Sequence, residues 1–252
     1  MSTERVVLIT GGTSGIGRGL AERYVATGAT VVVSGRDQRR LDATVAVLPG
    51  AVGIAGDLST PTDRERLADA VRERFGRLDV LVLNAGIQRR VAWAEDHAPW
   101  SERQQEIDLL LSAPVHLTAL LGDLVRAAPA GQIVVVTSGG AVVPQPFAPV
   151  YSAAKAAVRS WTTTLRAAHR GTVTQVTELL PPAVATGLAG PGAAHGADLD
   201  AFCDAVFPRL EAREDEVGYG LTDSLAFRAV LDAARERFTA AEGRFPVRGF
   251  AD

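Results

Sequence analysis

Residues 10–17 read Thr-Gly-Gly-Thr-Ser-Gly-Ile-Gly, and this glycine-rich stretch decides the fold. Residues 5–10, which read Arg-Val-Val-Leu-Ile-Thr, come before it and predict a strand, and the pattern after it predicts a helix over residues 15–27. Glycines at such a strand-to-helix turn let the backbone bend sharply and let a phosphate approach the amides of a helix N-terminus. We therefore predict a phosphate-binding turn; the alternative is a tight turn that binds nothing. The residues assigned to it are Gly11, Thr13, Ser14, Gly15, Ile16 and Gly17.

Short apolar runs alternate with amphipathic stretches along the rest of the chain. The runs contain valine, isoleucine and leucine without polar alternation, which is typical of strands that are buried on both faces. Strands that alternate with helices form a parallel sheet with right-handed crossovers. We predict strands at residues 30–34, 51–55, 79–83, 132–137, 173–180 and near 217–219, and helices at residues 36–47, 61–75, 101–126 and 151–169. The pattern predicts an α/β fold, with a doubly wound parallel sheet and helices on both faces.

Composition places the chain among ordinary globular proteins. Its 252 residues are 47% hydrophobic and 22% charged, with a formal net charge of -3. The slightly acidic balance gives no electrostatic footprint for nucleic acid, and the single cysteine, Cys203, excludes an internal disulfide. No apolar run reaches the ~18 residues of a membrane span, and the N-terminus has no signal-peptide pattern. We therefore expect a cytoplasmic protein without nucleic-acid or membrane partners, and the arginine-rich composition suggests a bacterial one.

The chain shows no linker that would divide it, so residues 1–252 are predicted to form a single domain. Residues 1–180 carry the alternation of strands and helices and are assigned to a cofactor-binding core. Residues 181–212 begin with a stretch rich in proline, glycine and alanine. Because open parallel sheets bind ligands beyond the carboxyl ends of their strands, we assign residues 181–212 to a substrate loop or lid.

The end of the second predicted strand bears on which nucleotide the turn would take. An acidic residue there would accept hydrogen bonds from a ribose diol, but the sequence reads Ser34-Gly35-Arg36. The Arg36 guanidinium would bind a 2′-phosphate, which favours NADP over NAD; the alternative is a solvated arginine at the start of a helix. Asp57 and Leu58, after the third strand, are assigned to the adenine end, with a turn-opening role as the alternative for Asp57.

Tyr151 and Lys155 are separated by one helical turn in the predicted helix over residues 151–169. That spacing places the phenol and the ammonium group on one face, about 5–6 Å apart at the Cβ atoms. A free tyrosine has a pKa near 10, and an adjacent cation is the direct way to bring it into the range of a useful acid or base. Lys155 is the single lysine in the chain, the other 25 of its 26 basic Lys and Arg residues being arginines. We interpret the pair as an acid/base group with its tuning cation rather than as solvated helix surface.

Together these motifs resemble the short-chain dehydrogenase/reductase family over essentially the whole chain. The residues that carry the resemblance are the glycine-rich stretch, Asn84-Ala85-Gly86 after the fourth strand, and Ser138, which lies 13 positions before Tyr151. The resemblance implies a Rossmann-type sheet of seven strands and hydride transfer between a nicotinamide and a carbonyl or secondary alcohol. It also implies that Tyr151 is the acid/base, that Ser138 hydrogen-bonds the carbonyl oxygen, and that Lys155 holds the nicotinamide ribose and tunes Tyr151.

The same resemblance assigns further residues to the cofactor. Asn84, Ala85 and Gly86 would brace the sheet beside it, and Pro181, Val184 and Thr186 would lie at its nicotinamide end. The chain departs from the family here, because the usual Pro-Gly pair after the sixth strand is Pro181-Pro182. Thr186 is at the position that usually contacts the carboxamide.

A second departure lies in the predicted helix over residues 101–126. The catalytic asparagine of the family aligns with Leu110, which cannot make a polar contact. Pro114 lacks an N–H group, so the Leu110 carbonyl has no partner four residues later and is free to hold the water that, by resemblance, links the lysine to solvent. We expect catalysis to survive, so that Leu110→Asn raises kcat by less than a hundredfold.

The residues expected to line the substrate side are mostly apolar and include no guanidinium group. They are Ser138, Val143, Gln145, Phe147, Tyr151 and Pro182, with Val184 and Phe202 as further candidates. This lining favours an uncharged or weakly polar ketone, aldehyde or secondary alcohol. Two alternatives are a lyase, cyclase or isomerase that uses the same acid/base residues without redox chemistry, and a module that binds the cofactor without turnover.

Metal chemistry and association complete the expectations. The four histidines are scattered, with no cysteine or carboxylate at metal-ligand spacing, so we predict no metal site. The two long helices resemble those through which family members pair, which predicts a homodimer or homotetramer. The apolar residues expected to contribute are Leu109, Leu117, Leu120, Leu121, Val158, Trp161 and Leu165.

Overall fold

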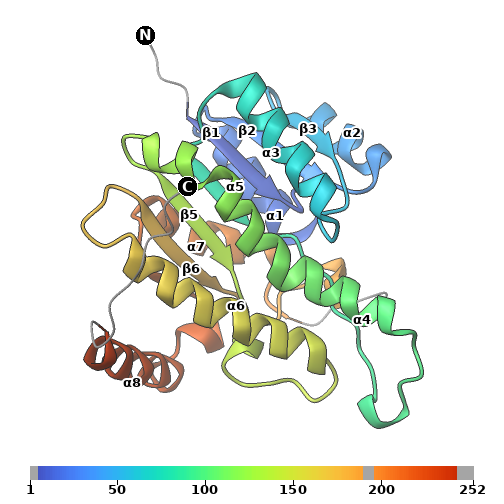
Figure 1. Cartoon of the computed structure of the whole chain (residues 1–252), viewed down its shortest axis with the longest axis vertical. Helices are drawn as coiled ribbons and strands as arrows, with labels where there is room; N and C mark the ends of the chain where they lie inside the picture. Colours follow the sequence, from blue (N-terminus) through green and yellow to red (C-terminus); the bar gives the residue numbers. More distant parts are fainter. Residues whose placement is uncertain (1–4, 190–195, 243–252) are drawn as a thin grey trace, which may run out of the picture.

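Seven parallel strands form one sheet at the centre of the molecule, in the order β3-β2-β1-β4-β5-β6-β7. The computed structural model describes residues 5–189 and 196–242 (Figure 1). The strands are β1 (Val6–Thr10), β2 (Thr30–Gly35), β3 (Val52–Ala55), β4 (Val80–Leu83), β5 (Gln132–Val136), β6 (Gln175–Leu180) and β7 (Glu216–Gly218). The predicted α/β fold with a seven-stranded parallel sheet is thereby confirmed.

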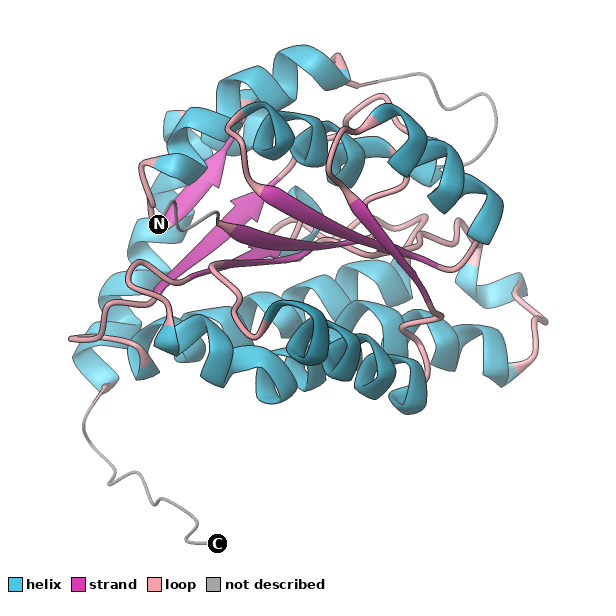
Figure 2. Ribbon diagram, turned by 90° about the horizontal axis from the view of Figure 1, so that it is seen from above, coloured by secondary structure: helices cyan, strands magenta, loops and turns pink. Residues whose placement is uncertain are grey.

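Helices cover both faces of the sheet, as Figure 2 shows. They are α1 (Gly15–Ala26), α2 (Gln38–Val47), α3 (Pro61–Phe75), α4 (Trp100–Ile107), α5 (Ala113–Ala127), α6 (Pro149–Ala168), α7 (Leu199–Glu211) and α8 (Leu225–Ala241). One hydrophobic core lies between the sheet and α1, α2 and α7. A second core lies on the other face, against α3, α5 and α6. Alternate residues of β1 enter opposite cores, Val7 the first and Leu8 the second, as expected for a strand buried on both faces.

The strand order explains where a site can form. The chain runs outward from β1 through β2 to β3, then crosses back to β4 on the other side of β1. This reversal of direction falls between β1 and β4, and open α/β sheets bind ligands beyond the carboxyl ends of their strands at such a point. The glycine-rich turn follows β1, Asn84 follows β4, Ser138 follows β5, and Pro181 follows β6. The topology therefore brings these four predicted segments to one edge of the sheet.

The predicted helix over residues 101–126 is interrupted. Between α4 and α5 the chain forms a π-helical segment, η2 (Asp108–Ser112), in which the Ala113 N–H bonds to the Asp108 carbonyl five residues earlier. Pro114 cannot donate to the Leu110 carbonyl, so a regular α-helix would lose a hydrogen bond at this position. The wider turn is the form that the helix takes next to this proline, and such turns are frequent at functional sites.

The segment of residues 181–212 divides into two parts. Residues 181–189 are irregular apart from an isolated bridge between Val184 and Ala197 and one short turn, η4 (Gly187–Ala189). Residues 190–195 lie outside the described residues. Helix α7, however, buries Phe202, Cys203, Val206 and Leu210 in the first core. The part of 181–212 that is available as a substrate loop therefore ends before Leu199.

One helical stretch of the described chain satisfies a simple criterion for crossing a membrane. By length and composition alone Trp100–Ala127 is long and apolar enough, with a mean hydropathy of 1.4 in its most apolar window. A helix that packs into the core of a globular domain meets the same criterion, and Leu117, Leu121 and Val125 of α5 lie in the second core.

Candidate active site at the carboxyl edge of the sheet

The glycine-rich turn is held against β4 by Asn84 and Ala85. The main-chain N–H groups of both residues donate to the Thr10 hydroxyl, at 2.8 and 3.0 Å, and Asn84 Nδ2 donates to the Thr10 carbonyl at 2.9 Å. A Cβ atom at Gly17 would lie 2.4 Å from Asn84 Nδ2, so no larger residue fits there. Gly11 and Gly15 have φ values of 65° and 51°, in the left-handed region that favours glycine. The predicted turn and the Asn84–Gly86 segment therefore form one unit.

This unit has the features of an anion-binding turn. Helix α1 begins at Gly15, and the side chain of its N-cap residue, Ser14, makes no capping hydrogen bond. The first N–H groups of a helix have no partner within the helix, and the helix dipole favours a negative group near them. Thr186 lies directly beside this turn, because a Cβ atom at Gly15 would be 3.2 Å from the Thr186 side chain. The structure thus brings together two segments that were assigned to the cofactor from opposite ends of the sequence.

The residues assigned to the adenine end differ in exposure and in the partners that they already have. Arg36 follows β2 directly, is exposed, and has no carboxylate partner among the described residues. It adjoins Gly35, where a Cβ atom would lie 2.8 Å from the Thr13 side chain, so Arg36 lies beside the glycine-rich turn. Asp57 Oδ1 accepts hydrogen bonds from the Ser59 N–H and hydroxyl groups, at 3.0 and 2.8 Å, which matches the turn-opening alternative. Leu58 is buried in the second core, so its side chain is not available to a cofactor.

Tyr151 and Lys155 lie in the first two turns of α6, on the face that packs against the sheet. Both are almost fully buried, each with 5% of its surface exposed. Lys155 Nζ donates to the Val136 carbonyl at 2.6 Å and lies 5.8 Å from the centre of the Tyr151 ring. Ser138 follows β5, and its Oγ accepts a hydrogen bond from the Gly140 N–H at 3.0 Å. The structure therefore brings the three predicted catalytic residues to one edge of the sheet, beside the carboxyl end of β5.

Burial dominates the titration of this pair. Desolvation lowers the pKa of Lys155 from 10.5 to about 8. Desolvation also raises the pKa of Tyr151, a hydrogen bond with Ser138 lowers it, and the negative charge of Glu106 raises it further. The sequence suggested a tyrosine pKa lowered by the neighbouring lysine, but Lys155 directs its ammonium group at the Val136 carbonyl instead. In this conformation the raised pKa of Tyr151 keeps the phenol protonated near neutral pH.

Leu110 occupies the place that the sequence assigned to it. It is fully buried and packs with Ala148, Tyr151 and Ala154 in a small apolar cluster. A Cβ atom at Gly86 would lie 3.1 Å from Leu110 Cδ2, so this leucine also contacts the Asn84–Gly86 segment. Asp108 and Ser112 hydrogen-bond to each other at 3.1 Å rather than to the site. The polar group expected at this position in the family is thus replaced by an apolar contact with Tyr151.

Three of the predicted substrate residues, Val143, Gln145 and Phe147, lie in a segment that runs beside residues 88–91. We call residues 88–91 and 143–147 together the substrate wall. Val143 and Phe147 are exposed, and Gln145 Oε1 accepts a hydrogen bond from Gln88 Nε2 at 3.1 Å. The Val91 N–H donates to the Phe147 carbonyl at 2.9 Å, so residues 88–91 run beside residues 145–147. Pro182 is half-buried after β6. Phe202 is fully buried in the first core and does not line this wall.

Sequence reasoning missed three residues here. Gln88 and Arg90 were not assigned to the site, although the Arg90 guanidinium lies 5.1 Å from the centre of the Phe147 ring. A guanidinium group therefore does border the substrate wall, contrary to the expectation. Glu106, which is buried on α4, was also missed. The position of Gln88 and Arg90 shortly after β4, at the same edge as Asn84, was the signal that pointed to this region.

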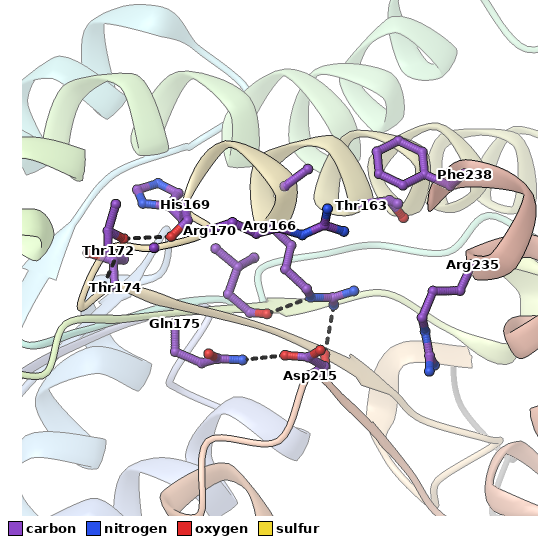
Figure 3. A pocket seen from close by; sticks show the side chains of 13 residues that line it. Thr163, Arg166, His169, Arg170, Thr172, Thr174, Gln175, Asp215, Arg235 and Phe238 are labelled. Atoms are coloured by element: carbon purple, nitrogen blue, oxygen red, sulfur yellow. Dashed lines mark hydrogen bonds between the residues drawn. The ribbon is translucent and has the colours of Figure 1, made fainter. Parts of the chain in front are cut away.

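A separate cavity of about 220 Å³ lies at the other end of α6 (Figure 3). It is bordered by the C-terminal turns of α6, the start of β6 and helix α8. Arg166 donates there to the Val176 and Asp215 carbonyls at 2.9 and 2.7 Å, and Gln175 donates to Asp215 Oδ1 at 2.7 Å. These polar groups already bind one another, and the cavity is at the amino end of β6, away from Tyr151. Among the described residues no cluster of histidine, cysteine, aspartate and glutamate could hold a metal ion.

Comparison with known proteins agrees with this geometry. A family model described as short chain dehydrogenase matches residues 5–195. The uncharacterized oxidoreductase DltE of Bacillus subtilis is 40% identical over 186 residues, which are 74% of this chain and 74% of that protein. An Arabidopsis thaliana protein named 11-beta-hydroxysteroid dehydrogenase-like 3 is 33% identical over 193 residues, 74% of this chain and 61% of its own length. The solved structure of a short-chain dehydrogenase from Sphingobium yanoikuyae in complex with NADPH has a TM-score of 0.83 and 26% identity, covering 97% of this chain and 98% of that one.

Proposed function

The chain belongs to the short-chain dehydrogenase family, and we propose that it is an NADP(H)-dependent oxidoreductase that acts on a carbonyl or secondary alcohol. The observation that carries the proposal is the buried pair Tyr151 and Lys155 beside Ser138, at the same edge of the sheet as the glycine-rich turn. A buried phenol and a buried ammonium group are costly to fold, and such groups collect at sites where proton transfer is needed.

The residues of the glycine-rich turn fit a dinucleotide. The free N–H groups at the start of α1 and the absence of side chains at Gly11, Gly15 and Gly17 leave room for a diphosphate close to the backbone. When bound, the nicotinamide supplies or accepts the hydride. Arg36 supports the 2′-phosphorylated form, because it follows β2 where an acidic residue would favour NAD, and its guanidinium has no carboxylate partner among the described residues.

The proton chemistry rests on residues of this chain. The protonated Tyr151 phenol donates its proton to the carbonyl oxygen during reduction and takes it back during alcohol oxidation. The Ser138 hydroxyl hydrogen-bonds to the same oxygen, and the Lys155 ammonium stabilises the phenolate that forms. The apolar contact between Leu110 and Tyr151 leaves these residues in place.

The substrate wall supports a largely apolar carbonyl compound. Val143 and Phe147 present exposed apolar surface, and Gln88 and Gln145 offer neutral hydrogen-bonding groups. Arg90 at its edge adds one possibility that composition did not suggest, a keto acid whose carboxylate meets the guanidinium. A screen with NADPH therefore includes neutral aromatic ketones and matched keto acids, with Arg90→Gln as the test of carboxylate recognition.

Calorimetric titration of the purified protein with NADPH and with NADH is the first test. We expect micromolar binding of NADPH, with NADH at least ten times weaker, and an Arg36→Ala variant that loses most of this preference. Arg126→Ala is a matched control, because Arg126 is also exposed and lies on α5, away from the glycine-rich turn. Binding of neither nucleotide would reject the proposal in favour of non-redox chemistry.

Turnover separates the remaining alternatives. Tyr151→Phe removes the proton donor and is expected to abolish reduction while NADPH binding stays nearly unchanged. A product that forms at the same rate with and without NADPH would identify a lyase, cyclase or isomerase. Binding without turnover on any carbonyl compound would identify a cofactor-binding module.

A further inference from the structure

Glu106 is a carboxylate in the interior of the protein that the proposed reaction does not use. It lies in the last turn of α4 and is the one residue of that helix that is buried, with 1% of its surface exposed. Moving an ionised carboxylate from water into a protein interior is costly unless it is paired. Its position therefore calls for a physical reason.

Other buried carboxylates of this chain have a cationic partner. Glu178 pairs with Arg159, and Asp79 pairs with Arg77 at 2.6 Å. Glu106 Oε1 accepts a hydrogen bond from the main-chain N–H of Arg89 at 3.1 Å, but among the described residues no guanidinium or ammonium group forms an ion pair with it. The Arg89 guanidinium instead pairs with Glu102 at 3.0 Å. Glu106 is thus held by a single neutral donor, which leaves its charge to act on its surroundings.

Tyr151 belongs to those surroundings. Glu106 precedes Leu110 by about one helical turn, and Leu110 packs directly against Tyr151. The negative charge of Glu106 raises the pKa of Tyr151, in addition to the larger effect of burial. Burial in turn raises the pKa of Glu106. The charge of Glu106 therefore acts on Tyr151 across the interface between α4 and α6.

The Arg89 hydrogen bond connects the same carboxylate to the substrate wall. Residues 88–91 carry Gln88, which bonds to Gln145, and Arg90, which lies over the Phe147 ring. Arg89 lies between Gln88 and Arg90 in the chain, so the hydrogen bond from its N–H to Glu106 holds residues 88–91 in place relative to α4. Loss of the acceptor would leave a main-chain donor unsatisfied in the middle of the wall.

We propose that Glu106 is a positioning residue that keeps Tyr151 protonated to higher pH, and so extends the reduction of a carbonyl compound to more alkaline pH, while it anchors residues 88–91 of the substrate wall. This inference rests on the proposed function. In the reduction the hydride adds to the carbonyl carbon, the Tyr151 proton adds to the oxygen, and the products are the alcohol, NADP⁺ and a phenolate that regains a proton from solvent. Glu106 transfers no proton itself; its charge disfavours the phenolate. The other charged groups that face this pair from the described elements are Lys155 on α6 and Arg89 after β4, and the Arg89 guanidinium turns to the half-exposed Glu102 on α4.

The first test observes the phenol without any substrate. The three tyrosines are labelled with ¹³C at Cζ, the Tyr151 signal is assigned with Tyr151→Phe, and the free protein is titrated to about pH 11. Glu106→Gln keeps the hydrogen-bond acceptor and removes the charge, so the Tyr151 signal should titrate about half a unit to one unit lower than in the wild-type protein. Glu102→Gln is the matched control, because it removes a half-exposed carboxylate from the same helix, and it should leave the titration unchanged. Coincident titrations of the wild-type and Glu106→Gln proteins would overturn the inference.

The second test uses turnover, with 9,10-phenanthrenequinone and NADPH as the probe. The alkaline limb of kcat should move to lower pH in Glu106→Gln, with KM for the quinone nearly unchanged. Glu106→Leu also removes the acceptor of the Arg89 N–H, so KM should rise about tenfold. Equal KM values in the two variants would overturn the anchoring role. A shifted titration without any NADPH-dependent reduction would reject the proposed function while the coupling of Glu106 to Tyr151 stands.

Discussion

Lys155 is a lysine at a buried position where an arginine would fit poorly. The chain uses arginine at 25 of its 26 basic Lys and Arg positions, yet it has lysine at this one. A guanidinium group would stay charged in the interior and needs several acceptors, whereas an ammonium group is compact and loses its proton more readily. Here one carbonyl, that of Val136, meets the ammonium group at 2.6 Å, and burial lowers the pKa to about 8. The lysine therefore suits a place where one acceptor and little water are present.

The same burial predicts that Lys155 costs stability. A pKa lowered from 10.5 to about 8 corresponds to about 3 kcal/mol below pH 8, where both the folded and unfolded forms hold the proton. Lys155→Met removes this cost but leaves the Val136 carbonyl without its donor, so we expect the free energy of unfolding at pH 7 to rise by about 1–2 kcal/mol. Between pH 8 and 10.5 the unfolded chain binds the proton more strongly, the cost fades as the pH rises, and the advantage of the variant should shrink.

Denaturant unfolding of the cofactor-free protein at pH 7 and pH 9.5 measures this difference. Lys155→Met should be inactive at both pH values although it is more stable at the lower one. A variant that is less stable than the wild-type protein at pH 7 would show that the ammonium group contributes more to packing than it loses by desolvation.

Some residues of the candidate site could be predicted from the sequence and others could not. The proximity of Tyr151, Lys155 and Ser138 could be predicted, because it follows from their spacing along the chain. Glu106 and Arg90 were not, because what matters for them is a contact between residues that lie far apart in sequence, such as that of Arg90 with Phe147. Leu58 shows a different limit, because the sequence could not show that its side chain is buried in the second core, which leaves its main chain for the predicted cofactor contact.

At the scale of an element, α6 is positioned by an ion pair one turn after the proposed catalytic residues Tyr151 and Lys155. Tyr151, Lys155 and Arg159 follow one another at four-residue intervals, so they share the face that meets the sheet. The Arg159 guanidinium pairs with Glu178, which is fully buried on β6 and also accepts a hydrogen bond from the Thr137 hydroxyl at 2.7 Å. This pair fixes the register of α6 along β6 one turn after Lys155.

Arg159→Ala should therefore destabilise the protein by about 3 kcal/mol, because it leaves the Glu178 carboxylate buried without a cation. Burial already raises the pKa of Glu178 while Arg159 opposes that effect. The loss should be largest at pH 8 and smaller near pH 5, where protonation relieves the unpaired charge in the variant. Thermal unfolding at the two pH values tests this, with Arg126→Ala on α5 as the exposed control. Equal losses at both values would show that packing of the Arg159 side chain, not its charge, is responsible.

The bounds of helices and strands were predicted well where the hydrophobic pattern and the residues at the ends are enough to set them. The helix over residues 61–75 agrees with α3 at both ends, since Thr60 caps it, Pro61 begins it and Gly76 ends it in a left-handed conformation. The π-helical turn of η2 was not predicted, although Pro114 gave the reason for it, because a hydrophobic pattern does not distinguish an α-turn from a wider one. Helix α7 was assigned to a loop because the stretch before it is rich in glycine and proline, and its own apolar face was not recognised.

At the scale of the whole molecule, the strand order determines where the candidate site lies, and the long helices determine how much apolar surface is exposed. Of the seven apolar residues expected to support association, Leu117, Leu121 and Val158 are used in the second core. Leu109, Leu120, Trp161 and Leu165 are partly buried beside it. Trp100 and Val115 remain exposed on α4 and α5, within a helical stretch whose most apolar window is 33% buried. This helical stretch therefore presents more apolar surface than a solvated helix needs.

We expect this surface to be covered by a second copy, so that sedimentation at micromolar concentration gives a dimer or tetramer. Val115 is 37% exposed on α5, and Val115→Glu should shift the protein toward the monomer because a carboxylate would be buried in the interface. Val230→Glu is the control, since Val230 is also exposed but lies on α8. The apolar helix admits a second explanation, a lipid surface, and flotation with phosphatidylcholine vesicles distinguishes the two. A monomer that floats with vesicles would assign Trp100–Ala127 to a membrane. A dimer that stays in solution would assign this stretch to the subunit interface.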